Sequence, residues 1–229
     1  MIQTAVRSRG AVLIWTDTAL YQMQFIGPPF TFGFKQLGSN CGCIGLHSAI
    51  DISGTSFWMG TDSFFMFDGA VKKVPCSVQD YVFDDLNQNA KQDIYCAANT
   101  DFNEVIWFYP SGNSTQMDRQ VTYNYAENLW YVGSLARSSW ADRDVYDNPY
   151  ATEYKASDTT ATISTIYGTK AGRTFVYAHE NGVNADGSAM TAYVESGDMD
   201  IADGDQFMSM SRFIPDFKDQ SGNVDVTIK

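Results

Sequence analysis

Three tryptophans, each closing a short apolar run, constrain the fold of this chain more than any other feature. The runs are Val12–Trp15, Ser56–Trp58 and Val105–Trp107. Trp58 follows Trp15 by 43 residues, and Trp107 follows Trp58 by 49. This interval is about the length of one four-stranded blade of a β-propeller. Residues 10–21 also parallel residues 54–65, starting from Gly10 and Gly54. The pattern predicts a β-repeat in which Trp58 is largely buried.

The composition supports a β fold with a packed core. Hydrophobic residues make up 44% of the 229 positions, and 15 Phe, 13 Tyr and 5 Trp suit half-buried pleated surfaces, while 18 Gly suit turns. We therefore expect an all-β fold of antiparallel, propeller-like blades with one short helix between blades, which form either a complete or an incomplete propeller. The predicted organisation is a single region, 1–229, with blades at 1–45, 46–98, 99–135 and 173–229, and a long loop or insertion at 138–172.

Alternation and turn residues place the individual strands. Asp68-Gly69 between two apolar runs is the strongest hairpin signal in the chain, and Gly27-Pro28-Pro29 marks another turn. Apolar residues at helical spacing predict one short helix over 77–87, with Ser77 and Asp80 as a capping box. The predicted strands cover residues 11–15, 19–25, 30–34, 56–58, 64–67, 70–74, 94–98, 104–109, 121–125, 129–132 and 174–177.

The end of the sequence alternates again at Val224, Val226 and Ile228. A last strand at this position either pairs with the first strand to close a ring or belongs to a longer protein. An uncovered strand edge templates further pairing, so it needs a partner in either case.

The net charge of −12 restricts the binding partners. A chain with 27 acidic and 15 basic side chains gains no affinity for nucleic acid from the release of counterions bound to phosphates. We therefore expect no tight binding to DNA or to an anionic membrane. The same charge suits either the wall of a channel through which DNA moves or ordinary solubility.

The start of the chain lacks a signal-peptide core, and no apolar stretch is long enough for a membrane anchor, so we expect folding in the cytosol.

The four cysteines are too few and too uneven for a disulfide framework. Cys41, Cys43 and His47 suggest a zinc site, but there is no second pair of ligands to complete a tetrahedron. We expect reduced, mostly buried thiols, with zinc as the alternative.

The sequence contains no recognisable set of catalytic residues. We therefore expect that the protein is not an enzyme and that it binds no cofactor and no metal. Neither His47 nor His179 stands in a metalloprotease motif, and there is no nucleophile elbow or phosphate-binding glycine loop. Residues 48–58 faintly resemble an aspartate box with the wrong spacing, so a turn is the plainer interpretation. Residues 184–187 and 198–205 offer oxygen ligands for calcium, but they do not fit an EF-hand and suit solvated turns better.

Several short sequence segments, which together span most of the chain, resemble the packaged-DNA stabilisation, or tail-nozzle, proteins of short-tailed bacteriophages. These segments are residues 54–69, 75–83, 104–110, Tyr123-Asn124-Tyr125 with Trp130, Arg137 with Trp140, His179–Gly182 and Gly204-Asp205-Gln206. The resemblance implies a β-propeller that assembles as a homo-oligomeric, sixfold ring with other tail proteins at the end of the virion tail. Such proteins are made in the host cytoplasm and retain the packaged DNA until ejection. Compared with that family, this chain looks truncated at both ends.

Two other classes of function remain open. A carbohydrate-binding or sialidase-like propeller needs Trp, Tyr and carboxylates clustered around one pocket mouth. A host-derived interaction propeller would bind a peptide on its top face.

Overall fold

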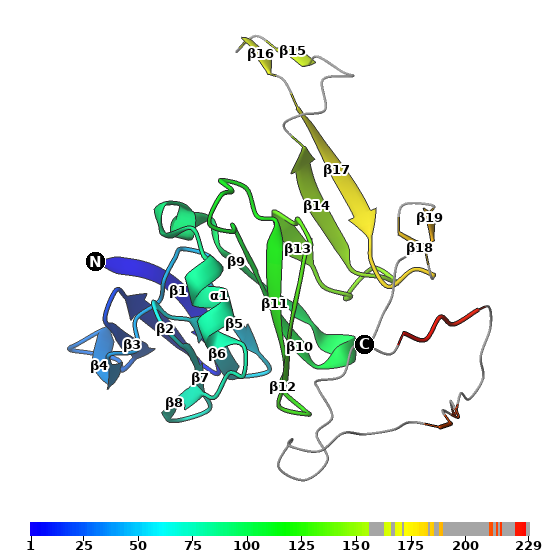
Figure 1. The fold of residues 1–229 in the computed structure, drawn as a ribbon. Coiled ribbons are helices and arrows are strands. Elements are labelled where there is room, and N and C mark those ends of the chain that lie inside the picture. The colour runs from blue at the N-terminus through cyan, green and yellow to red at the C-terminus, as the bar shows by residue number, and fades with distance from the viewer. Residues whose placement is uncertain are drawn as a thin grey trace. The chain divides into compact units, whose positions relative to one another are not determined.

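The computed structural model describes residues 1–155, 163–165, 168–170, 172–182, 184–185, 188–189, 211–212, 214, 216 and 223–227. The chain forms two compact units, Met1–Gly182 and Val183–Lys229. Four antiparallel sheets dominate the first unit, so the predicted all-β class is confirmed (Figure 1). We call these sheets blades 1 to 4.

The first three blades are four-stranded meanders, in which each strand pairs with the next one along the chain. Blade 1 holds β1 (Ile2–Ser8), β2 (Ala11–Thr16), β3 (Ala19–Phe25) and β4 (Phe32–Ser39). Blade 2 holds β5 (Ala49–Ile52), β6 (Thr55–Met59), β7 (Phe64–Phe67) and β8 (Val71–Val74). Blade 3 holds β9 (Tyr95–Asn99), β10 (Glu104–Tyr109), β11 (Arg119–Asn124) and β12 (Leu129–Gly133).

Blade 4 is three-stranded, in the order β13 (Ser139–Ala141), β14 (Tyr150–Lys155) and β17 (Arg173–Ala178). Two short hairpins complete the strands of the described residues: β15 (Ile163–Thr165) with β16 (Gly168–Lys170), and β18 (Asn184–Ala185) with β19 (Ser188–Ala189). The helical segments are α1 (Gln79–Asp85) and the 3-10 turns η1 (Gln88–Asp93) and η2 (Thr100–Phe102).

The blades stack through their first strands. Strand β1 lies against β5, β5 against β9, and β9 against β13. A parallel bridge between His47 and Tyr95 strengthens the contact of blades 2 and 3. Because side chains alternate across each sheet, an inner blade carries one apolar face toward the blade before it and one toward the blade after it.

A left-handed residue precedes the second strand in each of the first three blades. These residues are Gly10 (φ +81°), Gly54 (φ +87°) and Asn103 (φ +59°), the residue types that adopt this conformation most readily. They close the turns between the first and second strands, and therefore mark equivalent positions in the three blades. Counted from these turns, the repeat intervals are 44 and 49 residues.

The turn alignment changes which tryptophans are equivalent. Trp58 and Trp107 correspond to Ile14, and all three side chains face away from the following blade. Trp15 is one residue out of step and corresponds to Met59, so it faces blade 2 and meets Trp58 edge-on at 5.5 Å. The burial predicted for Trp58 is confirmed, since this side chain is 0% exposed, and Trp15 and Trp107 are buried as well. The 43-residue tryptophan interval, however, is not the structural repeat.

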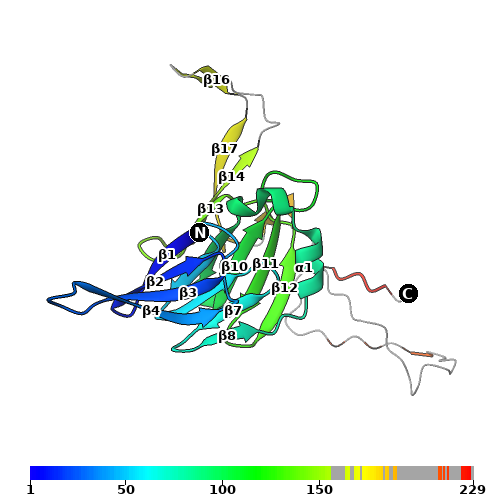
Figure 2. The same ribbon diagram turned by 90° about the vertical axis from the view of Figure 1, so that its left-hand side faces the viewer.

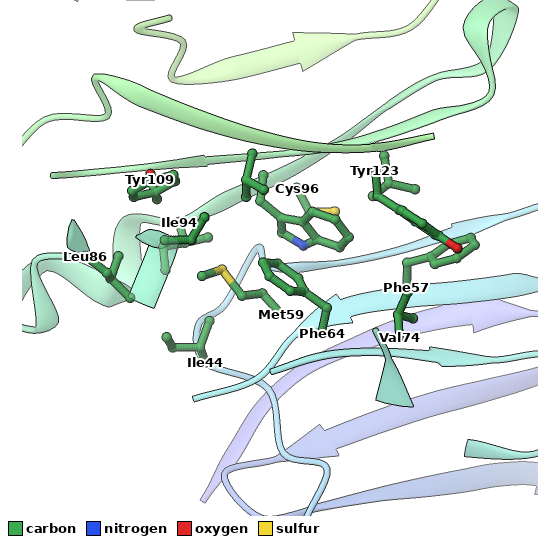
Figure 3. Close-up of a cluster of buried hydrophobic side chains, with 14 residues drawn as sticks. Ile44, Phe57, Met59, Phe64, Val74, Leu86, Ile94, Cys96, Tyr109 and Tyr123 are labelled. Carbon is green, nitrogen blue, oxygen red and sulfur yellow. The ribbon is translucent and has the colours of Figure 1, made fainter. Parts of the chain in front are cut away.

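The largest apolar cluster lies between blades 2 and 3 (Figure 3). Phe57, Met59 and Phe64 from blade 2 approach Tyr109 and Tyr123 from blade 3 in this view. The buried members of the cluster are Ile44, Phe57, Met59, Phe64, Val74, Val82, Leu86, Ile94, Cys96, Val105, Trp107, Tyr109, Val121 and Tyr123.

The predicted helix exists, but its predicted cap is wrong. Helix α1 begins at Gln79 after Val78, and no side chain caps its first turn. Val82 is its buried residue, and Val82 and Leu86 both join the cluster between blades 2 and 3. Packing of this apolar edge, rather than capping, therefore holds the helix. The hairpin predicted at Asp68-Gly69 is confirmed, with Phe67 paired to Val71 across the turn.

Three sequence-based boundaries differ from the structure. Strand β9, which the sequence placed with the second blade, pairs with β10 in blade 3. Residues 138–172, expected to be a long loop or insertion, contain β13 and β14, which form blade 4 with β17. The strand expected at Val224–Ile228 is absent from its described part, residues 224–227. Short strands rich in Ser, Thr and Tyr gave too little apolar alternation to reveal β13 and β14.

Candidate functional site

The cysteine and histidine motif of the sequence forms a polar turn rather than a metal centre. Cys43 Sγ lies 3.0 Å from Ser48 Oγ and 3.5 Å from the carbonyl oxygen of Gly45. Burial raises the pKa of the Cys43 thiol to about 11, although the Ser48 hydrogen bond opposes this shift. The predicted free thiols are confirmed: Cys41, Cys43 and Cys96 are buried, and Cys76 is half-buried.

Within the described part of the chain, no group of three or more His, Cys, Asp or Glu side chains is arranged to hold a metal ion. Residues 198–205, one candidate calcium segment, lie outside the described residues. Asn184 and Ala185 of the other segment form β18. Among the described helices, none has the length and hydropathy to cross a membrane.

The aspartate-box-like segment is a hairpin turn, as predicted. Asp51 accepts hydrogen bonds from the backbone N–H of Gly54 at 2.9 Å and from Ser56 Oγ at 2.7 Å. Both carboxylate oxygens are thus used inside the turn, and Ser53 and Gly54 take left-handed conformations. The carboxylate stabilises the β5–β6 connection.

A cluster of charged and polar side chains lies in blade 4 beside blade 3. Arg137 is only 9% exposed, and its Nε donates to His179 Nε2 at 2.8 Å. One terminal nitrogen of Arg137 donates to the Ala136 carbonyl and lies 3.5 Å from Glu153 Oε2. The guanidinium stacks 4.3 Å from the centre of the Tyr177 ring. A buried cation is therefore held by an imidazole, a carboxylate and an aromatic face.

This arrangement fixes the protonation of His179. Burial, with the neighbouring charge of Arg137, lowers the His179 pKa to about 4. The ring must stay neutral at Nε2 to accept from Arg137, because a protonated ring would oppose one donor with another. Burial also lowers the pKa of Arg137, while Glu153 counteracts this shift. We call Arg137, Glu153, Tyr177 and His179 the arginine cluster.

Further polar contacts join blade 4 to blade 3. Asp142 accepts from the hydroxyl of Thr100 at 2.7 Å and from its backbone N–H at 3.2 Å. Tyr95 donates to the carbonyl of Trp140 at 3.2 Å, and the Trp140 ring lies 4.6 Å from that of His179. The junction is built from hydrogen bonds around a small apolar centre.

Two carboxylates meet at the edge of this junction. The Asn99 side-chain amide donates to Glu104 at 3.3 Å and to Glu180 at 3.5 Å, and the Tyr131 hydroxyl also donates to Glu104. Burial and the Glu104 carboxylate raise the pKa of Tyr131. Each carboxylate oxygen of Glu104 accepts one of these hydrogen bonds, from Asn99 and from Tyr131. This favours a structural role for Glu104 over acid–base chemistry.

A shallow pocket of about 400 Å³ opens where blades 2 and 3 meet the start of blade 4. Its lining residues are Leu46, His47, Gln92, Asp93, Tyr95, Thr115, Gln116, Met117 and Ser138. The lining offers one aromatic ring with a phenol, one imidazole and one carboxylate. It lacks the tryptophan and paired carboxylates that a sugar-binding mouth would need.

No sequence motif marks the arginine cluster as a unit. The resemblance covers Arg137, Trp140 and His179, but it does not include Glu153 or Tyr177. The backbone N–H of His179 donates to the Pro149 carbonyl, and its ring accepts from Arg137, 42 residues earlier. Only the pairing of β14 with β17 brings these residues together.

Comparison with known proteins adds no relative to this description: no protein-family model matches the chain, and no curated protein matches it.

Proposed function

We propose that this protein is a structural component of the tail of a short-tailed bacteriophage, of the nozzle or head-completion type, which closes the tail channel and retains packaged DNA until ejection. In this proposal the protein is made in the host cytoplasm, acts in the virion tail as a homo-oligomeric ring with other tail proteins, and has no catalytic role.

The observation that carries the proposal is the location of the residues on which the resemblance rests. Trp58 Nε1 donates to the Cys41 carbonyl at 2.9 Å, and Trp130 Nε1 donates to the Pro75 carbonyl at 2.8 Å. Trp107 Nε1 reaches the Ser48 carbonyl at 3.1 Å, which joins blade 3 to the start of blade 2. Arg137 and His179 belong to the arginine cluster inside blade 4. The tryptophans join the blades and their connecting segments, and the arginine cluster braces one blade, which supports a resemblance of architecture rather than of chemistry.

The charge supports passage of DNA better than capture of DNA. A net charge of −12 repels phosphate, so DNA would move past such a wall without adhering to it. Gel shifts at moderate salt test this point directly. We expect no binding to duplex DNA at micromolar protein, and tighter binding would contradict a low-friction channel.

The main alternative, a carbohydrate-binding or sialidase-like propeller, receives less support. The pocket lined by His47, Asp93 and Tyr95 is shallow and has no tryptophan in its lining. A glycan array separates the two functions. Specific binding to one glycan class, lost on Tyr95→Ala, would favour the alternative.

The decisive experiment uses the phage that carries this gene. An amber mutation in the gene should yield heads that fill with DNA and then lose it, measured as nuclease-sensitive DNA in purified particles. A plasmid copy of the wild-type chain, or of the exposed-site variant Leu129→Ala, should restore retention. Normal retention without the protein would overturn the proposal.

A further inference from the structure

Blade 1 turns one apolar sheet face away from the rest of the stack. We call this the open face, and it consists of Val12, Ile14, Tyr21, Met23, Phe25, Phe32 and Phe34. The strand registers place these side chains on one side, since Ile14 pairs with Tyr21, Val12 with Met23, Met23 with Phe34 and Phe25 with Phe32. Leu13, Trp15 and Leu20 point the other way, into the cluster with Trp58.

The open face is built like the inner faces that another blade covers. Its central residue, Ile14, occupies the position of Trp58 in blade 2 and of Trp107 in blade 3. Those two tryptophans are 0% and 1% exposed, because the preceding blade lies on them. Ile14 and Val12 are only half-buried. Blade 1 therefore carries an apolar surface of the inter-blade type that the described residues leave uncovered.

The β3–β4 hairpin extends this surface beyond the sheet (Figure 2). Phe25 and Phe34 are each 66% exposed and Phe32 is 51% exposed, with the rings of Phe25 and Phe32 in edge contact at 6.0 Å. Residues 18–34 contain no charged side chain. A contiguous patch of this kind marks an interaction site on a protein of otherwise ordinary surface.

The charge of the chain is unevenly divided, and blade 1 stands apart. Residues 1–50 contain three basic side chains, Arg7, Arg9 and Lys35, and the single acid Asp17. The other 12 basic and 26 acidic side chains lie in residues 51–229. Arg7 pairs in register with Val12 and so belongs to the side of the open face. A second copy of this chain thus offers an acidic partner to a mildly basic surface.

The other end of the stack offers a matching surface. Trp140, Ala151 and Tyr177 of blade 4 share one face, and Trp140 packs on Phe108 of blade 3. The opposite face carries Tyr150 and Val176, which are 36% and 67% exposed. Asp144 and Asp147 are exposed in the loop leading to it.

We propose that the outward face of blade 4 in one copy stacks on the open face of blade 1 in the next copy. This continues the blade-on-blade series from one subunit to another, in a head-to-tail contact of the kind that closes into a ring when the rotation permits. The inference rests on the ring assembly in the proposed function and assigns the surfaces that form it.

The first test is a charge placed on the open face. Phe34→Glu should raise the dissociation constant of self-association about tenfold or more, measured by mass photometry over a dilution series. Leu129→Glu, at a residue 56% exposed in blade 3, is the matched control and should leave association unchanged. Phe34 is exposed in the single chain, so circular dichroism should show both variants folded.

The second test is a cross-link between copies. Chains carrying Phe34→Cys and Val176→Cys should form a mixed disulfide dimer when combined under mild oxidation, and neither variant alone should do so efficiently. Dimers of the Phe34→Cys chain alone would show that two open faces meet, which overturns the head-to-tail contact. A chain that stays monomeric and instead floats with phosphatidylcholine vesicles would assign the face to lipid and overturn it as well.

The outcomes separate this inference from the proposed function. If copies assemble but Phe34→Glu leaves the assembly intact, the assigned surface is wrong and the tail role stands. If the amber mutant retains its DNA, the tail role fails whatever the cross-link shows.

Discussion

Two of the three blade junctions of the first unit, those on either side of blade 3, solve the same packing problem with different chemistry. Between blades 2 and 3 the contact is a continuous apolar cluster centred on Phe64 and Trp107, whose ring centres are 4.9 Å apart. Between blades 3 and 4 the apolar centre is small. Asp142 and Tyr95 form hydrogen bonds across it, and the arginine cluster of blade 4 lies beside it through the contact of His179 with Trp140. The titratable side chains of the first junction, Cys96, Tyr109 and Tyr123, have pKa values raised by burial, so they stay neutral in acid. Beside the second junction, the pKa of His179 is lowered by burial, so this group takes up a proton only in acid. Most of the folding free energy should therefore come from the junction of blades 2 and 3, and most of its dependence on acid pH from the junction of blades 3 and 4.

The largest effect should come from the apolar junction. Trp107→Ala removes a fully buried ring and one of the two hydrogen bonds to the Ser48 carbonyl, so it should lower the free energy of unfolding by roughly 3–5 kcal/mol. Urea unfolding followed by fluorescence measures the change. Leu129→Ala is the control and should change it by less than about 0.5 kcal/mol. A loss under about 1 kcal/mol for Trp107→Ala would mean that this junction is not the stable one.

Truncation of Arg137, the buried cation beside the polar junction of blades 3 and 4, should lower the free energy of unfolding by less. Arg137→Ala leaves Glu153 without its buried partner and His179 Nε2 without a donor, which should cost about 2 kcal/mol. Arg137→Lys keeps the charge but not the Nε contact, and should fall between wild type and Arg137→Ala. A variant as destabilised as Trp107→Ala would erase the contrast between the two junctions.

Acid should weaken the polar junction selectively. The folded-state pKa of His179 is about 4, below its ordinary value of 6.5, so the unfolded chain binds a proton first as the pH falls. Stability from this group is thus present above about pH 6.5 and is lost toward pH 4. With solvent screening of the partly exposed ring, we expect a loss of ~1–2 kcal/mol between pH 7 and pH 4.5.

The matched variant for the acid effect is His179→Gln, which keeps a hydrogen-bond acceptor but does not titrate. Its unfolding free energy should vary less with pH than that of wild type over the same range. Parallel pH profiles for the two proteins would show that His179 does not sense acid.

The smallest effect should come from the exposed ion pair of the polar junction. Arg143 pairs with Asp101 at 2.5 Å, but both side chains are about half-exposed. Arg143→Gln should leave the unfolding midpoint unchanged at about 0.15 M salt, because solvent and ions screen such pairs. A clear drop that salt does not reduce would mean that this pair is part of the buried network.

Local chemistry made most of the strands predictable. Alternating apolar residues and turn signals located the strands of the first three blades, apart from β1 and β5, and the Asp68-Gly69 hairpin. They failed in blade 4, where β13 and β14 carry too few apolar residues to alternate visibly. They also failed at α1, where Ser77 suggested a cap but packing of Val82 and Leu86 holds the helix.

The sequence by itself determined the all-β class, the buried tryptophans and the acidic surface, because these follow from composition and from patterns within a few residues. Only the tertiary structure decided that Trp58 is equivalent to Ile14 rather than to Trp15. A shift of one residue moves a strand side chain to the opposite face, so an interval of 43 instead of 44 changes which blade a tryptophan meets. The arginine cluster likewise depends on β14 meeting β17, because its members lie up to 42 residues apart in the chain.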